Sequence, residues 1–186
     1  MRFIQRYPTP EGFDDLLMCS DGETLTGLWF EGSRDANNHL LNLVETCHDA
    51  SLPSVFSETF HWLDLYFSGR QPDFTPSYRM DGLTPFRKQV SDIMCEIPFG
   101  QIMTYGEIAK HIAETCHHAP QPTRKMSAQA VGGAVGWNPI CIIVPCHRVV
   151  GANGNLTGYG GGMHNKIALL KHEGHDMSRV KQIIVR

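Results

Sequence analysis

The sequence predicts an α/β (α+β) fold in two parts, a small N-terminal domain that contains β-strands and a mainly helical C-terminal domain. Two apolar-rich runs flank Asp21 and Gly22, a dipeptide favoured in β-hairpins. After Thr84, apolar residues recur at helical spacing instead. Residues 71–81, between these regions, are rich in proline and polar side chains, which is typical of a linker. We therefore expect two domains, residues 1–78 and 79–186.

Two helices are expected to follow the hairpin in the N-terminal domain. The first is predicted around Asn38–His48. The second, around Val55–Phe67, carries large apolar side chains at helical spacing and is followed by Gly69, a residue type that commonly ends helices. The N-terminal domain should therefore combine a small sheet with two helices.

Three helices of the C-terminal domain are predicted from their N-caps. Thr84 precedes a proline at the first helical position, and this helix ends near Pro98. Thr104 caps a second, short helix. After a long polar loop at residues 115–126, Ser127 caps a third helix of small residues. The last two helices resemble a helix-turn-helix, and the glycines of the third make it weak unless DNA or another helix packs closely against it.

The remaining segments complete the C-terminal domain. Residues 139–144 carry the chain to Cys146, and the apolar runs on both sides of that cysteine within residues 143–150 read as buried strand. Residues 149–159 read as a hairpin around Asn153-Gly154. Residues 163–172 are predicted to form a last helix, with Gly174 as its C-terminal cap.

Composition indicates a globular intracellular protein. The chain has 186 residues, of which 41% are hydrophobic, so it can bury a sizeable core. It contains no apolar run near the ~18 residues that a membrane span needs, and its N-terminus lacks a signal-peptide core. Six cysteines without Cys-x-x-Cys spacing favour reduced thiols. We expect a cytoplasmic location and no membrane partner.

Charge is divided unevenly along the chain. Residues 1–81 hold 5 Lys+Arg against 13 Asp+Glu, a balance of −8, whereas residues 82–186 hold 11 against 6, a balance of +5. Such asymmetry is a hint of nucleic-acid contact by the basic half, although a basic surface that contacts only solvent would give the same charge balance.

The neighbours Cys146 and His147 suggest a reactive thiol. A cysteine attacks as its thiolate, and a nearby imidazole can take its proton if a third group orients that imidazole. Glu173 is our candidate for the orienting group. The alternative is that Cys146 is a small, inert core residue, as many free cysteines are.

Nearly the whole chain, and most strongly residues 84–174, resembles the O6-alkylguanine-DNA alkyltransferases, or methylated-DNA-protein-cysteine methyltransferases. Ordered motifs carry the resemblance: Ile97-Pro98-Phe99-Gly100, Thr104-Tyr105-Gly106-Glu107-Ile108-Ala109, Ala130-Val131-Gly132-Gly133-Ala134, Asn138-Pro139, Pro145-Cys146-His147-Arg148 and His172-Glu173-Gly174. The resemblance implies an RNase H-like N-terminal domain and a C-terminal domain of winged helix-turn-helix character. It also implies DNA repair by irreversible, stoichiometric transfer of a methyl or other alkyl group from guanine O6 to Cys146.

The resemblance assigns roles to further residues. Tyr105 would assist base extrusion and give a proton to the departing guanine; otherwise it is an aromatic packed on the core. DNA contact is expected of Thr104, Arg124, Lys125, Ala128, Gln129, Ala130 and Gly132. A pocket or structural role is expected of Asn138, Pro145, Arg148, Val149, Tyr159, Gly160 and Gly161. Arg148 is expected to make structural bonds behind the site, and Asn138 to brace the turn before it, unless it belongs to an ordinary Asn-Pro turn.

Two positions depart from the pattern of the family. Gln129 stands where the family has an arginine that fills the gap left by the extruded base. Glutamine can fill space and form hydrogen bonds but brings no charge, so we expect weaker duplex binding and extrusion, partly offset by Arg124 or Lys125. Some members carry serine where Gly160 stands, so only a backbone contact to the base is expected there.

Two other functions compete with this interpretation. A non-catalytic, alkyltransferase-like protein would bind the lesion without transfer; such relatives replace the acceptor cysteine, which is present here. A cysteine hydrolase would use Cys146 and His147 on a small ester or amide. We expect double-stranded DNA containing O6-alkylguanine as the partner, a monomer and no cofactor. We expect no metal, because His111, Cys116, His117 and His118 match no compact zinc pattern.

Overall fold

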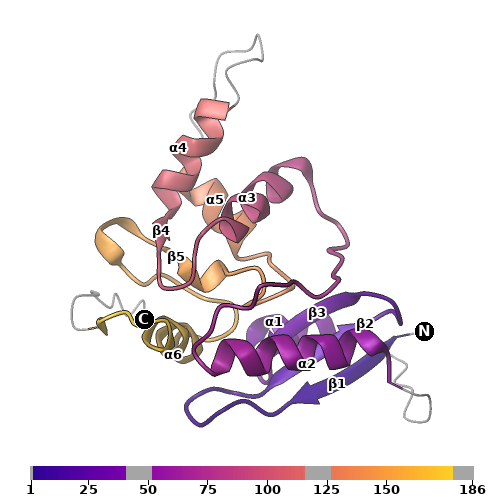
Figure 1. The fold of residues 1–186 in the computed structure, drawn as a ribbon. Helices are drawn as coiled ribbons and strands as arrows, with labels where there is room; N and C mark the ends of the chain where they lie inside the picture. Colours follow the sequence, from indigo (N-terminus) through magenta and orange to yellow (C-terminus); the bar gives the residue numbers. More distant parts are fainter. Residues whose placement is uncertain (1, 41–51, 116–126, 178–186) are drawn as a thin grey trace.

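A computed structural model describes residues 2–40, 52–115 and 127–177 (Figure 1). It begins with an antiparallel sheet of strands β1 (Phe3–Tyr7), β2 (Leu16–Ser20) and β3 (Leu25–Phe30), in that order. The hairpin predicted around Asp21-Gly22 is therefore confirmed as the β2–β3 pair. Figure 1 shows this sheet with α1 and α2 in one half of the molecule, and α3, α4 and α5 in the other.

Two helices accompany the sheet. Helix α1 (Arg34–Leu40) packs against β3, and it starts four residues before the predicted Asn38; the rest of that predicted helix lies outside the described residues. Helix α2 (Ser54–Phe67) begins one residue before its predicted start and packs against β2. Its buried face includes Tyr66, whose hydroxyl reaches the centre described below.

The next three helices start where their caps predict. The Arg87 amide donates to the Thr84 hydroxyl at the start of α3 (Pro85–Cys95), at 3.3 Å. At α4 (Tyr105–Thr115), the amides of Thr104 and Glu107 each donate to the other's side chain, at 2.7 and 3.1 Å. At α5 (Ala128–Val135), Ser127 accepts from the Ala130 amide at 3.1 Å. Each cap satisfies amides that the first helical turn leaves without a partner.

Helix α5 is held by close packing on α3 and α4. Its Val131, Ala134 and Val135 are buried, and a Cβ added at Gly132 would touch the Tyr105 ring at 3.9 Å. The packing of α5 on α3 and α4 compensates for the low helix propensity of its glycines. The expectation that a neighbouring helix supports this segment agrees with the packing.

The apolar run after Cys146 forms strand β5 (Val149–Val150), but the strand predicted for the run before it, at residues 143 and 144, is wrong. Residues 141–144 form buried turns, and Ile142 has a left-handed φ of 67°. The Ile143 amide donates to Cys141, and the Val144 amide to Ile140, at 2.8 and 3.1 Å. The turns satisfy these two amides locally, while the Pro139 carbonyl and the Cys141 amide hydrogen-bond to Leu28 of β3 and make Ile140 a single bridge to that strand.

The hairpin predicted at residues 149–159 is also not formed as expected. Strand β5 (Val149–Val150) pairs in parallel with β4 (Met103–Thr104). The chain then turns through η2 (Ala152–Gly154), where Asn153 has φ 58° and the Gly151 amide donates to Asn155 at 2.7 Å. The turn predicted at Asn153-Gly154 is therefore present, but the partner of strand β5 is β4 and not the segment after the turn. A local sequence pattern does not reveal such a distant partner.

The last helix, α6 (Met163–His172), ends as predicted. Glu173 is its C-cap, and Gly174 follows with φ 89°, a conformation that glycine adopts without steric cost. One hydrophobic core cluster includes residues of the sheet, α2 and the C-terminal helices. The boundary at residues 78 and 79 stays a prediction. In the described part of the chain, no helix is long and apolar enough to cross a membrane.

Candidate active site

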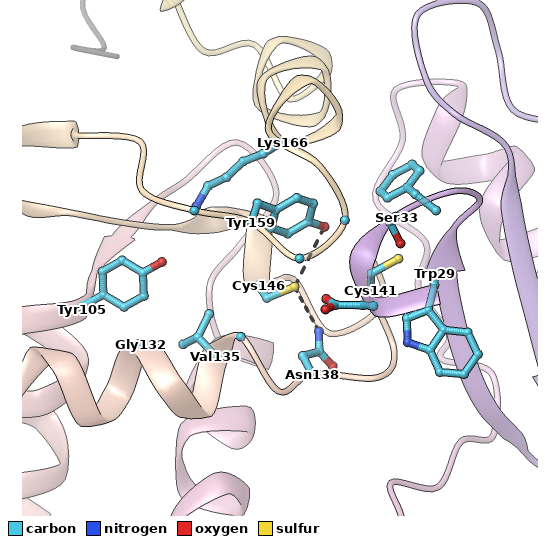
Figure 2. Close-up of a pocket in the computed structure, with 16 residues that line it drawn as sticks. Trp29, Ser33, Tyr105, Gly132, Val135, Asn138, Cys141, Cys146, Tyr159 and Lys166 are labelled. Carbon is cyan, nitrogen blue, oxygen red and sulfur yellow. Dashed lines mark hydrogen bonds between the residues drawn. The ribbon is translucent and has the colours of Figure 1, made fainter. Parts of the chain in front are cut away.

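Cys146 opens the short 3-10 helix η1 (Cys146–Arg148) and is 6% exposed. Figure 2 shows its sulfur between the side chains of Asn138 and Tyr159. The Asn138 amide nitrogen Nδ2 lies 3.1 Å from Sγ, and the Tyr159 hydroxyl lies 4.0 Å from it. The thiol is therefore held among polar groups at the edge of a cavity, although its residue is almost entirely buried.

Asn138 holds the turn that leads to the cysteine. Its Nδ2 also donates to the carbonyl of Val144 at 2.8 Å and to that of Ile140 at 3.3 Å, and its Oδ1 accepts from the Ile140 amide at 3.0 Å. One buried side chain thus connects both ends of the turn to Sγ. This geometry fits the bracing role expected for Asn138.

His147 is fully buried and lies beside Glu173. Its Nε2 lies 2.8 Å from Glu173 Oε1, and both side chains are fully buried. No hydrogen bond joins His147 to Cys146 within the described residues. His147 Nδ1 is buried, and the described residues offer it no hydrogen-bond partner.

Glu173 is the centre of a buried network. Oε1 accepts from the Tyr66 hydroxyl at 2.8 Å, and Arg148 donates to both carboxylate oxygens at 3.0–3.2 Å. The Gly100 amide donates to Oε2 at 3.1 Å. Arg148 also donates to the Ile97 carbonyl, which connects the network to the turn after α3. The carboxylate therefore joins residues from α2, η1, α6 and the α3–β4 connection.

These contacts determine the protonation states of Glu173 and His147. Burial alone would raise the pKa of Glu173, but the hydrogen bonds and charges of His147 and Arg148 hold it well below its ordinary value. Burial lowers the pKa of His147, more than Glu173 raises it. An ionised carboxylate only accepts hydrogen bonds, so a neutral His147 carries its proton on Nε2 and leaves Nδ1 as a base.

The thiol itself is not ionised by its surroundings. Burial raises the pKa of Cys146 above its ordinary value, while Asn138, Tyr159 and the charge of Lys166 act in the opposite direction. Lys166 is fully buried, donates to the Val149 carbonyl at 2.7 Å and lies 5.8 Å above the Tyr159 ring. Its own pKa falls to about 8 because of burial. A base must therefore take the proton of Cys146 before the sulfur can attack.

The cavity beside Cys146 holds about 470 Å³ of space that includes its opening to solvent. The predicted residues that line it are Tyr105, Gly132, Asn138, Cys146, Tyr159, Gly160 and Gly161. A second, more open groove of about 950 Å³ runs along the starts of α4 and α5. Its lining includes the predicted Thr104, Ala128 and Gln129, and it shares Tyr105, Gly132 and Gly158 with the cavity.

The other predicted residues are placed as follows. Ala130 is exposed on α5 but does not line the groove, and its amide is used by the Ser127 cap. Pro145 precedes η1, and Val149 offers its carbonyl to Lys166. Arg124 and Lys125 lie outside the described residues, as do Cys116, His117 and His118. No group of three or more metal-ligating side chains occurs in residues 2–40, 52–115 and 127–177.

Sequence reasoning missed several residues of the site. Tyr66 and Asp35 come from the N-terminal half. Cys141 lies between the Asn138-Pro139 and Pro145-Cys146-His147-Arg148 motifs, and Lys166 lies before the motif at residues 172–174. Tyr66 was placed only on the apolar face of a helix, and nothing local indicates that its hydroxyl meets Glu173. Lys166 carried a usable signal, because it precedes Leu169 and Leu170 by three and four residues and so belongs to the apolar face of the last predicted helix.

Known proteins resemble this chain over most of its length. Residues 85–175 match the family described as the DNA-binding domain of 6-O-methylguanine DNA methyltransferase. The methylated-DNA–protein-cysteine methyltransferase of Salmonella typhimurium is 37% identical over 165 residues, which are 86% of this chain and 88% of the relative. The protein of that name from Mycobacterium tuberculosis is 46% identical over 121 residues, 65% of this chain and 67% of its own.

Solved structures give the same result. The crystal structure of the Mycobacterium tuberculosis O6-methylguanine methyltransferase has a TM-score of 0.70 at 35% identity and covers 93% of both chains. A structure of the Mycobacterium tuberculosis protein in complex with DNA has a TM-score of 0.69 at 36% identity and covers 96% of this chain and 94% of its own. The expected fold is thereby confirmed. By sequence identity, coverage and fold, this chain belongs to the methylated-DNA–protein-cysteine methyltransferase family.

Proposed function

We propose that this protein repairs DNA by moving a methyl or other alkyl group from the O6 atom of guanine to Sγ of Cys146. One observation carries the proposal: the cavity of the thiol and the groove along α4 and α5 share Tyr105, Gly132 and Gly158. A base that leaves the duplex at the groove can therefore reach the sulfur without crossing the core.

Extrusion of the base is the first step. O6 of guanine is buried in a stacked duplex, so the nucleotide must rotate out, at a cost of a few kcal/mol that is least for a damaged pair. The N-terminus of α5 presents Gln129 on the surface, where it can occupy the gap that the base leaves. The open groove then accepts the backbone on either side of the lesion.

Transfer follows by in-line attack. A bond forms between Cys146 Sγ and the alkyl carbon while the bond from that carbon to O6 breaks, and the bonding electrons leave with the base. We propose that the thiol proton passes through one water to Nδ1 of His147, because that nitrogen is the free base of the pair with Glu173. The Asn138 Nδ2 donor and the Lys166 charge stabilise the developing thiolate.

The departing guanine requires a proton. Tyr105 lines both cavities and is mostly buried, which raises the pKa of its phenol and keeps it protonated at neutral pH. The Thr157 hydroxyl donates to the Tyr105 oxygen at 3.2 Å, so the phenol proton can point to the base. The thioether left on Cys146 has no route back to a thiol, so each molecule acts once.

We further propose that the protein acts as a cytoplasmic monomer. A thiol acceptor has to stay reduced, which the cytoplasm ensures. Among the described residues, the exposed large hydrophobic side chains are scattered: Leu52, Leu83 and Ile102. Single apolar residues of this kind need no partner surface.

The test is direct. The purified protein is mixed with a duplex containing one O6-methylguanine, and peptide mass spectrometry locates the adduct, with Cys146→Ser as the control. One methyl group on Cys146 per molecule, with repair that stops at equimolar DNA, supports the proposal. Tight binding without transfer would favour the lesion-binding function, and repeated turnover of a small ester would favour a hydrolase.

A further inference from the structure

The cavity of the acceptor thiol contains a carboxylate that the proposed chemistry does not use. Asp35, in the first turn of α1, lines the cavity together with Cys146, and its side chain is only 20% exposed. Its neighbour Arg34 approaches it from the outside, 3.4 Å from Oδ1, but is itself 72% exposed. A negative charge from the N-terminal half of the protein thus faces the place where the alkyl group must lie.

The position of this carboxylate depends on a glycine of the opposite wall. A Cβ added at Gly160 would overlap the carboxylate of Asp35. The carboxylate is thus in direct contact with the backbone of the segment beside Tyr159, in space that any side chain at residue 160 would occupy. The Asp35 carboxylate can therefore occupy this position only because residue 160 has no side chain.

Arg34 pairs with this carboxylate from the exposed side, but the cation that lines the cavity, Lys166, does not pair with it. Lys166 also lines the cavity, but its ammonium donates to the Val149 carbonyl. Figure 2 shows Lys166 on one side of Tyr159, and Cys141 and Ser33 of the cavity wall on the other. No salt bridge joins Lys166 to Asp35 among the residues that the structure describes.

We propose that Asp35 is a specificity-determining residue that selects alkyl groups by charge. The inference rests on the proposed alkyl transfer to Cys146. A substituent on O6 that extends past its first carbon enters the space around Asp35, where an anionic group meets a like charge in a partly dehydrated cavity. Neutral groups that donate hydrogen bonds find an acceptor there instead. Carboxyalkyl lesions should therefore be repaired more slowly than uncharged lesions of the same size.

The effect should be large enough to measure. Two unit charges a few ångströms apart in a protein repel strongly enough to change a rate by roughly tenfold or more. The carboxylate also raises the pKa of the Cys146 thiol. That second influence changes the transfer of every substrate alike, so a ratio of two substrates removes it.

The experiment uses two duplexes that differ only in charge. One carries O6-carboxymethylguanine and the other its neutral amide, O6-carbamoylmethylguanine; single-turnover rates to Cys146 are measured with the full-length protein. The ratio of the amide rate to the acid rate is expected to fall about tenfold in Asp35→Asn. Gly160→Ser, which displaces the carboxylate, should lower the ratio too, and combining both changes should lower it no further. Asp73→Asn, a loss of charge at an exposed position outside the cavity, should leave the ratio unchanged.

An unchanged ratio in Asp35→Asn would overturn the proposal, as would an equal fall in Asp73→Asn. Transfer from O6-methylguanine is measured in every variant. Methyl transfer by a variant shows that the variant is folded. If the unmodified protein transfers no methyl group, the proposed function is refuted, not the role of Asp35.

Discussion

The substitution Glu173→Gln should damage stability and chemistry together. The Glu173 carboxylate accepts hydrogen bonds from Tyr66, His147, Arg148 and the Gly100 amide, all in a buried setting. A glutamine keeps the shape but removes the charge, and its NH2 group would face donors instead of acceptors. Breaking one partner of a buried ion pair costs about 3–5 kcal/mol, because the other charge stays buried without its counterion.

This loss of stability lowers the midpoint temperature of unfolding. For a chain of this size each kcal/mol lowers the midpoint of unfolding by roughly 2–4 °C, so a fall of about 6–20 °C is expected at pH 7. Since the pKa of Glu173 is lowered in the folded state, its stabilisation is present above the ordinary carboxyl pKa and is lost as pH falls through the lower, folded value. The difference between the two proteins should therefore shrink in acid.

Thermal scans from pH 3 to pH 8 and single-turnover methyl transfer measure both effects. Without an anionic acceptor, the tautomer of His147 is no longer fixed, and transfer should slow by about 10²-fold or more at a temperature where both proteins are folded. Glu96→Gln, the same change at an exposed position on the C-cap of α3, should alter stability by no more than about 0.5 kcal/mol. An equal shift in both variants, or a difference independent of pH, would refute the reasoning about the buried network.

Three further predictions follow from the site. Gln129→Arg should raise the rate on an alkylated duplex but not on free O6-alkylguanine, because the arginine acts on extrusion; equal effects on both substrates would contradict this role. Lys166→Met removes a charge that favours the thiolate, so the pKa of Cys146 should rise; the pH dependence of its alkylation by iodoacetamide measures this, and an unchanged profile would exclude the electrostatic role. Tyr105→Phe removes the proton donor but keeps the ring, so transfer should slow by about 10²-fold with duplex affinity nearly constant; parallel losses of both would indicate a role in binding alone.

The parts of the fold that local chemistry determines could be predicted from the sequence. The starts of α3, α4 and α5 follow from Thr84, Thr104 and Ser127, since a cap and the amides that it satisfies lie within three residues. The end of α6 at Gly174 follows in the same way. The strand predicted at residues 143 and 144 failed because the Asn138 side chain and tight turns satisfy the backbone there, a solution that apolar spacing does not reveal.

The candidate site was predictable only in part for a related reason. Adjacency of Cys146 and His147 suggested that the imidazole takes the thiol proton, directly or through a water, but adjacency does not decide between the two; in the structure His147 hydrogen-bonds Glu173 and not Cys146. Tyr66 and Asp35 reach the site from α2 and α1, and the Tyr66–Glu173 contact joins residues 107 positions apart in the chain. Such long-range contacts depend on how the two halves pack, and no local pattern records them.

The hydroxyl of Tyr66 connects the N-terminal half of the chain to the network beside the acceptor thiol. Because Tyr66 belongs to the N-terminal half, the Glu173 network is complete only when that half is present and folded against the rest. A clipped chain that keeps residues 85–175 would retain the groove on α4 and α5 but lack this contact. The carboxylate that holds His147 beside Cys146 is therefore itself held in part by the N-terminal half of the chain.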